Sequence, residues 1–424
     1  MEQFKIRGGK KLHGEIEVLG VKNGILPLIA ASLLADRGQT VIRNVPNLND
    51  VHVISNVLEG LGGKVGYDGA SRTLCIDCTQ ISSLEAPYEW VSKMRASFLV
   101  IGPLVARFHE ARVSLPGGCA IGERRVDMHI EALQHLGASV TQDSGFVVAT
   151  TSGLRGTIYH FDFPTHTGTE NIMMAAVLAK GTTTLVNAAC EPEVVCLADF
   201  LNSMGARVYG AGTPTITIEG VSRLSAIEFT PIPSRIETAF FLAAAAITGG
   251  DVVVKNAVQQ NLSIVISKMQ QMGIEVTEVG DDALRARCNG RMRPVDITTW
   301  PFPGFPTDFQ PQMMALLTIA DGVGIVRETV FEKRLMHVDE LNRMGADVKT
   351  RFDEAVVTGV PRLNGAPVIA SDLQAGAGLV LAGLAAEGMT VVDRVYHIDR
   401  GYELLEERLT SLGADILRVN PTDT

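Results

Sequence analysis

The chain has 424 residues, of which 46% are hydrophobic and 20% charged, and its formal net charge is −10. This composition is typical of a folded globular protein, and the length favours two domains over one. The negative charge argues against a nucleic-acid-binding protein, which normally carries a basic face, but a local arginine cluster can still bind an anionic small molecule.

Cysteine usage and apolar runs indicate where the protein works. Six cysteines in a chain of this size do not form a disulfide scaffold. Cys75 and Cys78 have the spacing of a zinc-ligand pair, but they lie in an alternating strand pattern with no second pair near, so we expect a plain strand. The first residues show no apolar segment of the kind that signal peptides contain, so we expect no signal peptide, and no apolar run reaches about 18 residues. We therefore expect a cytoplasmic protein that does not associate with membranes.

One short pattern recurs six times along the chain: Leu or Met, then Gly, two further residues, and Val or Ile. Successive copies lie 68 to 75 residues apart, and their glycines are Gly62, Gly137, Gly205, Gly273, Gly345 and Gly413. Each copy ends an amphipathic helical stretch, such as 194–204, and precedes a β-rich run. We expect each glycine to be the C′ residue of its helix, where the left-handed backbone costs least for glycine.

A second pattern precedes each copy of the first. It consists of an apolar, alanine-rich helix, a turn and a β-branched strand; the helices include 25–34, 173–180, 240–247 and 379–386. Because these helices are apolar nearly all round, we expect them to be buried. The sequence thus predicts a strand–helix–strand–helix–strand unit of roughly 70 residues, used six times. Three units per half give two α/β domains with helices inside and sheets outside.

The boundary between the halves is expected near 229–234, where two prolines interrupt helix and sheet ladders. A cleft between two domains is a preferred ligand site.

Polar residues stand at the start of every buried helix. They are Lys22-Asn23, Arg95, Thr165 to Asn171, Ser234 to Glu237, Asp308 and Asp372. Basic and hydroxyl side chains there can hold an anion or simply form solvated turns and N-caps. Asp308 and Asp372 have two readings, an N-cap carboxylate or a base directed at a hydroxyl. Because the feature recurs in all six units, we expect the helix N-termini to converge on a shared site.

The segment from Val113 to His129 departs most from the repeat, because it replaces a regular link with a loop rich in glycine. Cys119 lies in this loop, and Arg124 and Arg125 follow it. The loop is either a surface turn with a packing cysteine or a reactive site whose thiolate is favoured by the arginines.

Several motifs together resemble one family from end to end. They are Lys22-Asn23, Met94-Arg95-Ala96-Ser97, Leu115-Pro116-Gly117-Gly118-Cys119, Gly122-x-Arg124, Phe305-Pro306-Thr307-Asp308, Ser371-Asp372-Leu373 and His397-Ile398-Asp399-Arg400-Gly401-Tyr402. The chain resembles the UDP-N-acetylglucosamine enolpyruvyl transferase (1-carboxyvinyltransferase) family of bacterial peptidoglycan synthesis. The resemblance implies a two-domain inside-out α/β barrel with residues 22–231 in one domain, 1–21 plus 232–424 in the other, and the active site in the interdomain cleft.

The resemblance also implies the reaction. The enolpyruvyl group of phosphoenolpyruvate moves to the 3-hydroxyl of UDP-N-acetylglucosamine and phosphate is released, without a metal or an organic cofactor. This is the first committed step of peptidoglycan synthesis, and so it belongs to cell wall biogenesis, cell shape, cell division and the cell cycle. No nucleic acid, membrane or obligate protein partner is expected.

The family motifs carry roles to individual residues. Lys22, Arg124 and Arg400 would bind the phosphate and carboxylate of phosphoenolpyruvate. Cys119 would act as general acid and can form a covalent adduct with phosphoenolpyruvate. Asp308 would take the proton of the sugar hydroxyl.

The family motifs also identify a carboxylate near the cysteine loop and a set of residues that contact the nucleotide sugar. Asp372 matches a carboxylate near the cysteine loop. The residues that match nucleotide-sugar contacts are Asn23, Arg95, Arg124, Arg125, Val126, Asp127, Met128, Thr165, His166, Asp308 and Val330.

Four positions depart from the family pattern. Arg125 replaces a proline, Thr165-His166-Thr167-Gly168-Thr169 replaces Ser-Val-Gly-Ala-Thr, Gln374 replaces an arginine, and Ser234 replaces an aspartate. These departures favour a competing hypothesis, a paralogue that acts on a different nucleotide or sugar hydroxyl.

A third hypothesis is a non-catalytic nucleotide-sugar sensor. The complete set of Lys22, Cys119, Arg124, Asp308 and Arg400 argues against it, because a sensor needs neither an acid nor a base. The related enolpyruvylshikimate phosphate synthase shares the fold but lacks the cysteine loop.

Overall fold

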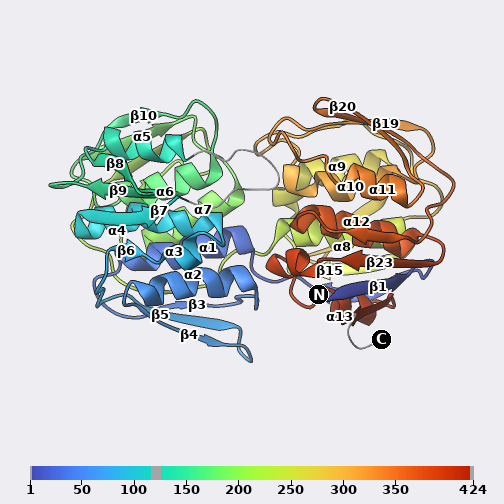
Figure 1. The fold of residues 1–424 in the computed structure, drawn as a ribbon, viewed down its shortest axis with the longest axis horizontal. Helices are drawn as coiled ribbons and strands as arrows, with labels where there is room; N and C mark the ends of the chain where they lie inside the picture. The colour runs from blue at the N-terminus through green and yellow to red at the C-terminus, as the bar shows by residue number, and fades with distance from the viewer. Residues whose placement is uncertain (1, 116–125, 421–424) are drawn as a thin grey trace. The chain divides into compact units, whose positions relative to one another are not determined.

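Six four-stranded sheets and their helices make up the computed structural model, which describes residues 2–115 and 126–420. The chain forms two compact units. One contains the described residues from Gly20 to Ile232, drawn from blue to green in Figure 1, and the other contains those up to Leu19 and from Pro233 onward.

The sheets of the unit from Gly20 to Ile232 share one topology. In sheet order their strands are β14 (Glu228–Phe229), β3 (Thr40–Ile42), β5 (Thr73–Asp77) and β4 (Lys64–Asp68); β6 (Glu85–Ala86), β7 (Glu110–Ser114), β9 (Phe146–Thr150) and β8 (Ser139–Asp143); and β10 (Ile158–His160), β11 (Thr182–Val186), β13 (Thr215–Glu219) and β12 (Arg207–Tyr209). The first two strands of each sheet are parallel, and the other neighbours are antiparallel.

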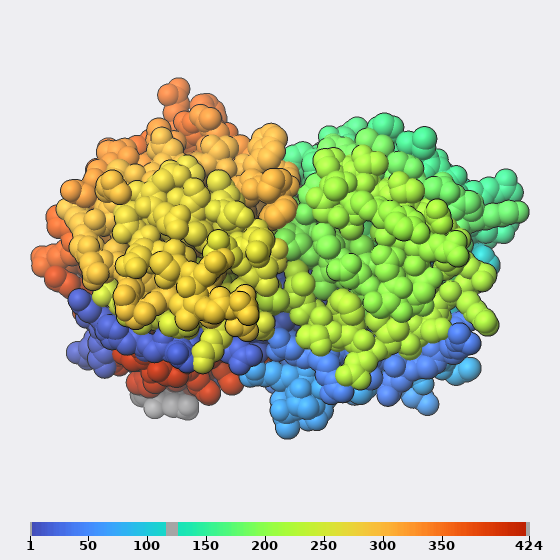
Figure 2. Space-filling view, turned by 180° about the vertical axis from the view of Figure 1, so that it is seen from behind, coloured from blue at the N-terminus to red at the C-terminus, as the bar shows by residue number. Residues whose placement is uncertain are grey.

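The other unit repeats this topology three times. Its strands are β18 (Ile297–Thr298), β19 (Val323–Arg327), β21 (Glu354–Thr358) and β20 (Asp347–Arg351); β22 (Pro367–Ile369), β23 (Met389–Asp393), β1 (Gln3–Arg7) and β24 (Asp415–Val419); and β2 (His13–Glu17), β15 (Asp251–Lys255), β17 (Ala283–Arg287) and β16 (Glu275–Val279). The N-terminal strands thus complete two sheets of the C-terminal unit. Figure 1 shows β1 beside β23, and Figure 2 shows the dark blue N-terminal residues beside the yellow residues of this unit.

Each sheet accompanies one buried and one amphipathic helix. The buried helices are α1 (Lys22–Ala31), α4 (Ile101–Phe108) and α6 (His166–Ala176) in one unit and α8 (Arg235–Ile247), α10 (Gln310–Leu317) and α12 (Leu373–Ala385) in the other. The amphipathic helices are α2 (Asn49–Gly60), α5 (Asp127–His135), α7 (Pro192–Ser203), α9 (Ser263–Gln271), α11 (Val338–Arg343) and α13 (Leu405–Ser411). The repeat and its buried helices are therefore confirmed.

The repeat contains one strand more than we expected. Five of the six amphipathic helices lead into an antiparallel two-stranded hairpin, such as β12–β13, and not into a single strand. The sixth, α13, leads into β24, which pairs with the N-terminal strand β1. The turns of these hairpins are short and the two strands have similar composition, so the sequence showed only one β-rich run.

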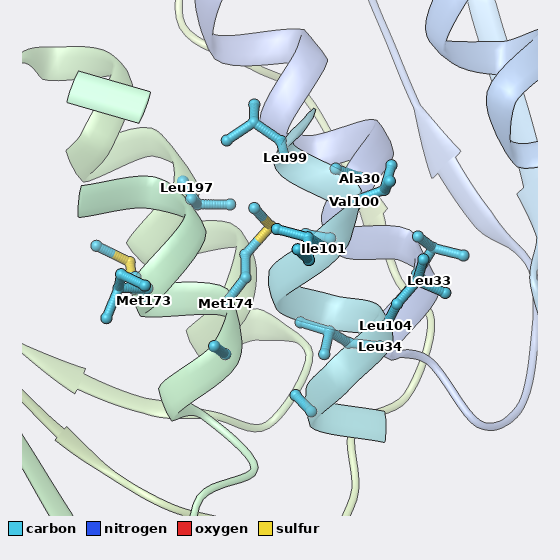
Figure 3. Packing of buried hydrophobic residues seen from close by; sticks show 14 of the residues in the cluster. Ala30, Leu33, Leu34, Leu99, Val100, Ile101, Leu104, Met173, Met174 and Leu197 are labelled. Atoms are coloured by element: carbon cyan, nitrogen blue, oxygen red, sulfur yellow. The ribbon is translucent and has the colours of Figure 1, made fainter. Parts of the chain in front are cut away.

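The buried helices pack against one another through apolar side chains. Figure 3 shows Met174 of α6 pointing toward Ile101 of α4, while Leu33 and Leu34 of η1 (Ser32–Leu34) lie on the other side of α4. Close approach of α4 to α6 depends on Gly102, because a Cβ there would lie 2.3 Å from Oδ1 of Asn171.

The repeated glycines do end the amphipathic helices. All six have positive φ, between 87° and 108°. The residue after each one donates its N–H back into the helix; for example, Ala206 N donates to Leu201 O at 3.0 Å, and Gly205 N donates to Asn202 O at 3.0 Å. This is the bonding of a Schellman motif, and it satisfies helix-end carbonyls that would otherwise lack donors.

The buried helices begin earlier than their apolar runs suggested. Lys22 and Asn23 lie in the first turn of α1 and not before it, and α6 begins at His166. The first N–H groups of a helix have no intrahelical acceptor, so polar side chains are favoured there and the apolar pattern starts only one turn later.

Two exclusions can be checked in the described residues. Cys75 lies in strand β5 as expected, and Cys75 and Cys78 are both free cysteines. None of the helices in the described part of the chain combines the length and apolarity that crossing a bilayer requires.

The Schellman glycines give a stability prediction. Gly205 has φ +108° and no neighbouring atom within 4 Å of an added Cβ, so Gly205→Ala should cost about 1 kcal/mol through backbone strain alone. Gly66, which is also open but has no positive φ, provides the control: Gly66→Ala should leave the free energy of unfolding unchanged or raise it. Equal losses in urea unfolding of the two variants would contradict this account.

Candidate functional site

Lys22 and Asn23 are the first two residues of α1. Lys22 Nζ lies 3.2 Å from Oδ2 of Asp50 in α2, and the Asp50 side chain is only 3% exposed. A lysine at a helix N-terminus is opposed by the helix dipole, and the buried carboxylate offsets this. Because an ammonium group has three donors and Asp50 uses one, the same group can also bind an anion.

Arg95 is the first residue of η2 (Arg95–Val100), which continues into α4. Its charge acts on His129, the third residue of α5. Burial, and secondly the positive charge of Arg95, lower the pKa of His129 to about 3. The imidazole is therefore neutral at physiological pH.

Hydrogen bonds fix the tautomer of His129. Gly102 N donates to Oδ1 of Asn171 at 2.8 Å, so the Asn171 amide nitrogen faces Nδ1 of His129 at 3.0 Å. The ring proton is then on Nε2, which lies 3.4 Å from Oγ1 of Thr167. This neutral histidine joins α4, α5 and α6, the helices whose starts carry most of the predicted nucleotide-sugar contacts.

The start of α5 carries three further predicted contacts. Val126 is the buried N-cap residue, Asp127 is the first helical residue, and the partly buried Met128 packs against the core. The negative charge of Asp127 is favourable at this end of the helix.

The start of α6 is capped by Thr165, whose hydroxyl accepts from Gly168 N at 3.3 Å. The N-capping interpretation of this segment is thus supported. His166 follows, with Nε2 lying 3.1 Å from Oε1 of Glu170, a fully buried carboxylate. Burial alone would lower the pKa of His166, but Glu170, together with Glu191 and Glu193, raises it to about 10. His166 is therefore a cation at neutral pH. Burial raises the pKa of its partner Glu170, and the adjacent His166 cation opposes that rise.

In the C-terminal unit, Arg334 lies between two predicted site carboxylates. Its Nη2 is 2.8 Å from Oδ1 of Asp308, and its Nη1 is 3.9 Å from Oδ1 of Asp372. Asp308 lies in η4 (Thr307–Phe309) and is not the N-cap, a position held by Pro306. Its N-capping interpretation is wrong, because the carboxylate is directed to the buried guanidinium of Arg334 instead.

Asp372 does cap a helix. Its Oδ1 accepts from Gln374 N at 2.9 Å and from Ala375 N at 3.2 Å at the start of α12. The structure therefore supports the N-cap interpretation for Asp372, which also lies near Arg334.

Val330 lies in a turn organised by Glu328. The Glu328 side chain is buried, and its Oε1 accepts from the backbone N–H of Val330 at 2.9 Å and of Phe331 at 3.2 Å. The same carboxylate accepts from the hydroxyls of Thr299 and Thr307, both at 2.9 Å.

Arg400 is the last residue of η5 (Val395–Arg400). The residues next to it in the chain make several contacts. Asp399 pairs with Arg418 through two bonds of 2.6 and 2.9 Å. The pKa of His397 is lowered by burial and by Arg400. Tyr402 is buried, with its hydroxyl 3.2 Å from Oε1 of Gln374.

The structure brings several predicted residues together and leaves others outside its description. Asp308, Asp372 and Val330 are linked through Arg334 and Glu328. Cys119, Arg124 and Arg125 lie outside the described residues.

Sequence reasoning missed Asp50, Arg334 and Glu328. Glu328 could have been noticed in the sequence. It directly follows β19, whereas the equivalent strands β11 and β15 are followed by Asn187 and Asn256. Asp50 and Arg334 could not have been noticed in this way, because only the tertiary structure shows that their charges are buried.

Three departures from the family pattern have local explanations. Ser234 caps α8 by accepting from Glu237 N at 3.3 Å. Gln374 accepts from Nε2 of Gln312 at 2.7 Å in the buried amide network that includes Tyr402. His166 pairs with Glu170. These residues serve local folding, which weakens the argument that they indicate a different acceptor.

The residues at the N-terminal ends of the buried helices can support anion binding and proton transfer. Lys22, Arg95 and His166 are cationic residues at helix starts, and Asp308 is a carboxylate held by an arginine. Within residues 2–115 and 126–420, no group of three or more His, Cys, Asp or Glu side chains is arranged to hold a metal ion.

Comparison with known families defines the class of protein. The sequence profile of the EPSP synthase (3-phosphoshikimate 1-carboxyvinyltransferase) family matches residues 6–409. The enolpyruvyl transferase NikO from Streptomyces tendae has the same fold, with a TM-score of 0.89, 26% identity and 99% coverage of each chain. EPSP synthase from Acinetobacter baumannii aligns with a TM-score of 0.79 at 19% identity over 99% of this chain and 100% of its own, which shows the fold alone. The chain is thus a carboxyvinyl transferase, and so an enzyme.

Sequence relatives narrow the assignment. UDP-N-acetylglucosamine 1-carboxyvinyltransferase from Desulfosudis oleivorans is 50% identical over 421 residues, covering 99% of this chain and all of the relative. The protein of the same name from Desulforapulum autotrophicum is 52% identical over 420 residues, with the same coverage. The chain belongs to the UDP-N-acetylglucosamine 1-carboxyvinyltransferase family, which confirms the resemblance seen in the sequence.

The pair of His166 and Glu170 gives a prediction on pH and stability. Folding raises the pKa of His166 from 6.5 to about 10, so its stabilisation is complete below pH 6.5 and lost as the pH rises to about 10. His166→Gln should lower the free energy of unfolding by about 2 kcal/mol near neutral pH, and the difference from the wild type should close near pH 10.

His160, an exposed histidine on β10 of the same unit, provides the control. His160→Gln should match the wild type throughout a series of urea unfolding curves between these pH values. A deficit of His166→Gln that stayed constant with pH would show that the ion pair is not its cause.

Proposed function

We propose that this enzyme transfers the enolpyruvyl group of phosphoenolpyruvate to the 3-hydroxyl of UDP-N-acetylglucosamine. In this reaction a bond forms between the sugar oxygen and C2 of phosphoenolpyruvate, the bond from C2 to the phosphate oxygen breaks, and inorganic phosphate leaves. The observation that carries the proposal is identity of about 50% over the full length of enzymes with this name.

The described residues support parts of this chemistry. Lys22, held by Asp50, supplies a fixed positive charge for the phosphate or carboxylate of phosphoenolpyruvate. The side chain of Asp308 is held in place by Arg334 and takes the proton of the attacking hydroxyl. In this proposal Arg124 and Arg400 complete the anion site, and Cys119 is the general acid.

The acceptor side of the proposal rests on the helix starts of the N-terminal unit. Arg95 and His166 are cations there, and a diphosphate bridge between nucleoside and sugar carries the opposite charge. Asn23, Asp127 and Met128 belong to the same set of expected contacts. Val330, whose backbone N–H donates to Glu328, is the member of this set that the C-terminal unit carries.

The proposed reaction assigns the protein to a cellular process. Its product is a precursor of peptidoglycan, so the enzyme would serve cell wall biogenesis and through it cell shape, cell division and the cell cycle. Both substrates are cytoplasmic metabolites, and we propose the cytoplasm as its location.

Phosphate release tests the function. The protein should release phosphate from phosphoenolpyruvate when UDP-N-acetylglucosamine is present, and the product should carry one enolpyruvyl group by mass spectrometry. Uridine nucleotides without the sugar and shikimate 3-phosphate serve as comparison acceptors. Release only with another acceptor would assign the chain to a paralogous reaction, and no release with any acceptor would favour a nucleotide-sugar sensor.

Asp308 and Cys119 provide a test of the assigned roles. Asp308→Asn keeps an oxygen for Arg334 but removes the base, so kcat should fall by about 10²- to 10⁴-fold. Asp281→Asn changes an exposed aspartate of the same unit and should not alter kcat. Full activity of Asp308→Asn would reject the base role, and full activity of Cys119→Ala would reject the acid role.

A further inference from the structure

The turn after β19 differs from the equivalent turns of two sister repeats. After β11, Asn187 donates its side-chain amide to the carbonyl of Phe161 at 2.8 Å, and after β15, Asn256 donates to the carbonyl of Val18 at 2.9 Å. Phe161 and Val18 each follow the edge strand of their sheet. The sister repeats thus join the second strand to the edge strand with a neutral amide.

Glu328 occupies the same place in the fifth repeat, but it makes a different set of bonds. It reaches the side chain of Thr299, the residue that follows edge strand β18. It also accepts from Thr307 Oγ1 through its second oxygen and from two backbone N–H groups of the next turn. Four donors need two acceptor oxygens, which a carboxylate has and an asparagine lacks.

A buried carboxylate is a costly way to join two strands. Glu328 is only 4% exposed, and burying its charge is unfavourable unless every bond is made. Because the sister repeats show that an amide joins these strands, the charge in the fifth repeat serves the extra partners. Those partners are Thr307 and the backbone of 330–331.

Both groups of extra partners are connected to Asp308, the proposed base. Thr307 immediately precedes Asp308 and begins η4. Phe331, held by Glu328, accepts from Arg334 N at 3.3 Å, and Arg334 binds the Asp308 carboxylate at 2.8 Å. Glu328 therefore holds both the backbone beside Asp308 and the segment that carries its arginine partner.

We propose that Glu328 is a positioning residue that sets the place of the Asp308 carboxylate and of the Val330 backbone for the transfer reaction. The inference rests on the proposed function and deepens it. Glu328 does not touch the reacting atoms; it acts through Thr307 and through the turn at 330–331. A misplacement of a base by about 1 Å can cost up to a hundredfold in rate, so such a device has a measurable effect.

The two threonines bound to Glu328 give a matched pair of variants. Thr307→Val removes only the hydrogen bond that Thr307 Oγ1 donates to Glu328 Oε2, next to Asp308 in the chain. Thr299→Val removes the bond toward the edge strand and also the acceptor of Thr329 N at 2.9 Å. Thr299 is fully buried, so its variant should lose more stability in urea unfolding, yet Thr307→Val should lose more activity.

The expected result is a crossed effect. Thr307→Val should lower kcat by about ten- to a hundredfold and leave KM for phosphoenolpyruvate within about twofold, while Thr299→Val should lower kcat by less than about threefold. In an Asp308→Asn background, Thr307→Val should have almost no further effect on kcat, because its effect acts through the missing base. Glu328→Gln, which keeps one oxygen and a polar amide, should retain more activity than Glu328→Ala.

Two outcomes would overturn the inference while the proposed function stands. One is that the variant with the larger loss of stability, Thr299→Val, also has the larger loss of kcat. The other is that Thr307→Val lowers kcat by the same factor in the wild type and in the Asp308→Asn variant. A wild-type protein that releases no phosphate with any acceptor would instead overturn the proposed function, and this inference with it.

Discussion

Enclosure of apolar helices is the constraint on which the rest of the structure depends. Helices such as α8 and α12 are buried along nearly their whole length, so they offer no polar face to solvent. Their N-terminal N–H groups nevertheless need partners, and polar residues must stand at those ends. The residues that we propose for the site lie at these ends, because the interior of each unit is filled by packed apolar side chains.

Charges at the helix starts are in turn fixed by buried counter-charges. Asp50 holds Lys22, Glu170 holds His166, and Arg334 holds Asp308. In each case the residue predicted to meet substrate is more exposed than the partner that holds it. A buried partner is screened little by solvent, so it orients the exposed group more strongly than a surface ion pair would.

Repetition also makes departures meaningful. Six copies of one unit show what folding alone requires, such as the Schellman glycines, and two of the copies join the second strand to the edge strand through an asparagine, after β11 and after β15. Glu328 stands where these two copies have asparagine, and it makes more hydrogen bonds than the asparagines make. His166 and Gln374, by contrast, depart from the family pattern and yet form local pairs that account for them.

The sequence by itself determined the repeat, the buried helices, the glycine helix ends and the family, because each is encoded in local periodicity or in contiguous motifs. Gly205 needs its conformation whatever surrounds it. Tertiary structure alone decided that Asp308 pairs with Arg334 and does not cap its helix, that His129 is a neutral link among three helices, and that five of the amphipathic helices are followed by a hairpin. These depend on which side chains meet across a core and on how far water is excluded there, and neither property is a function of spacing along the chain.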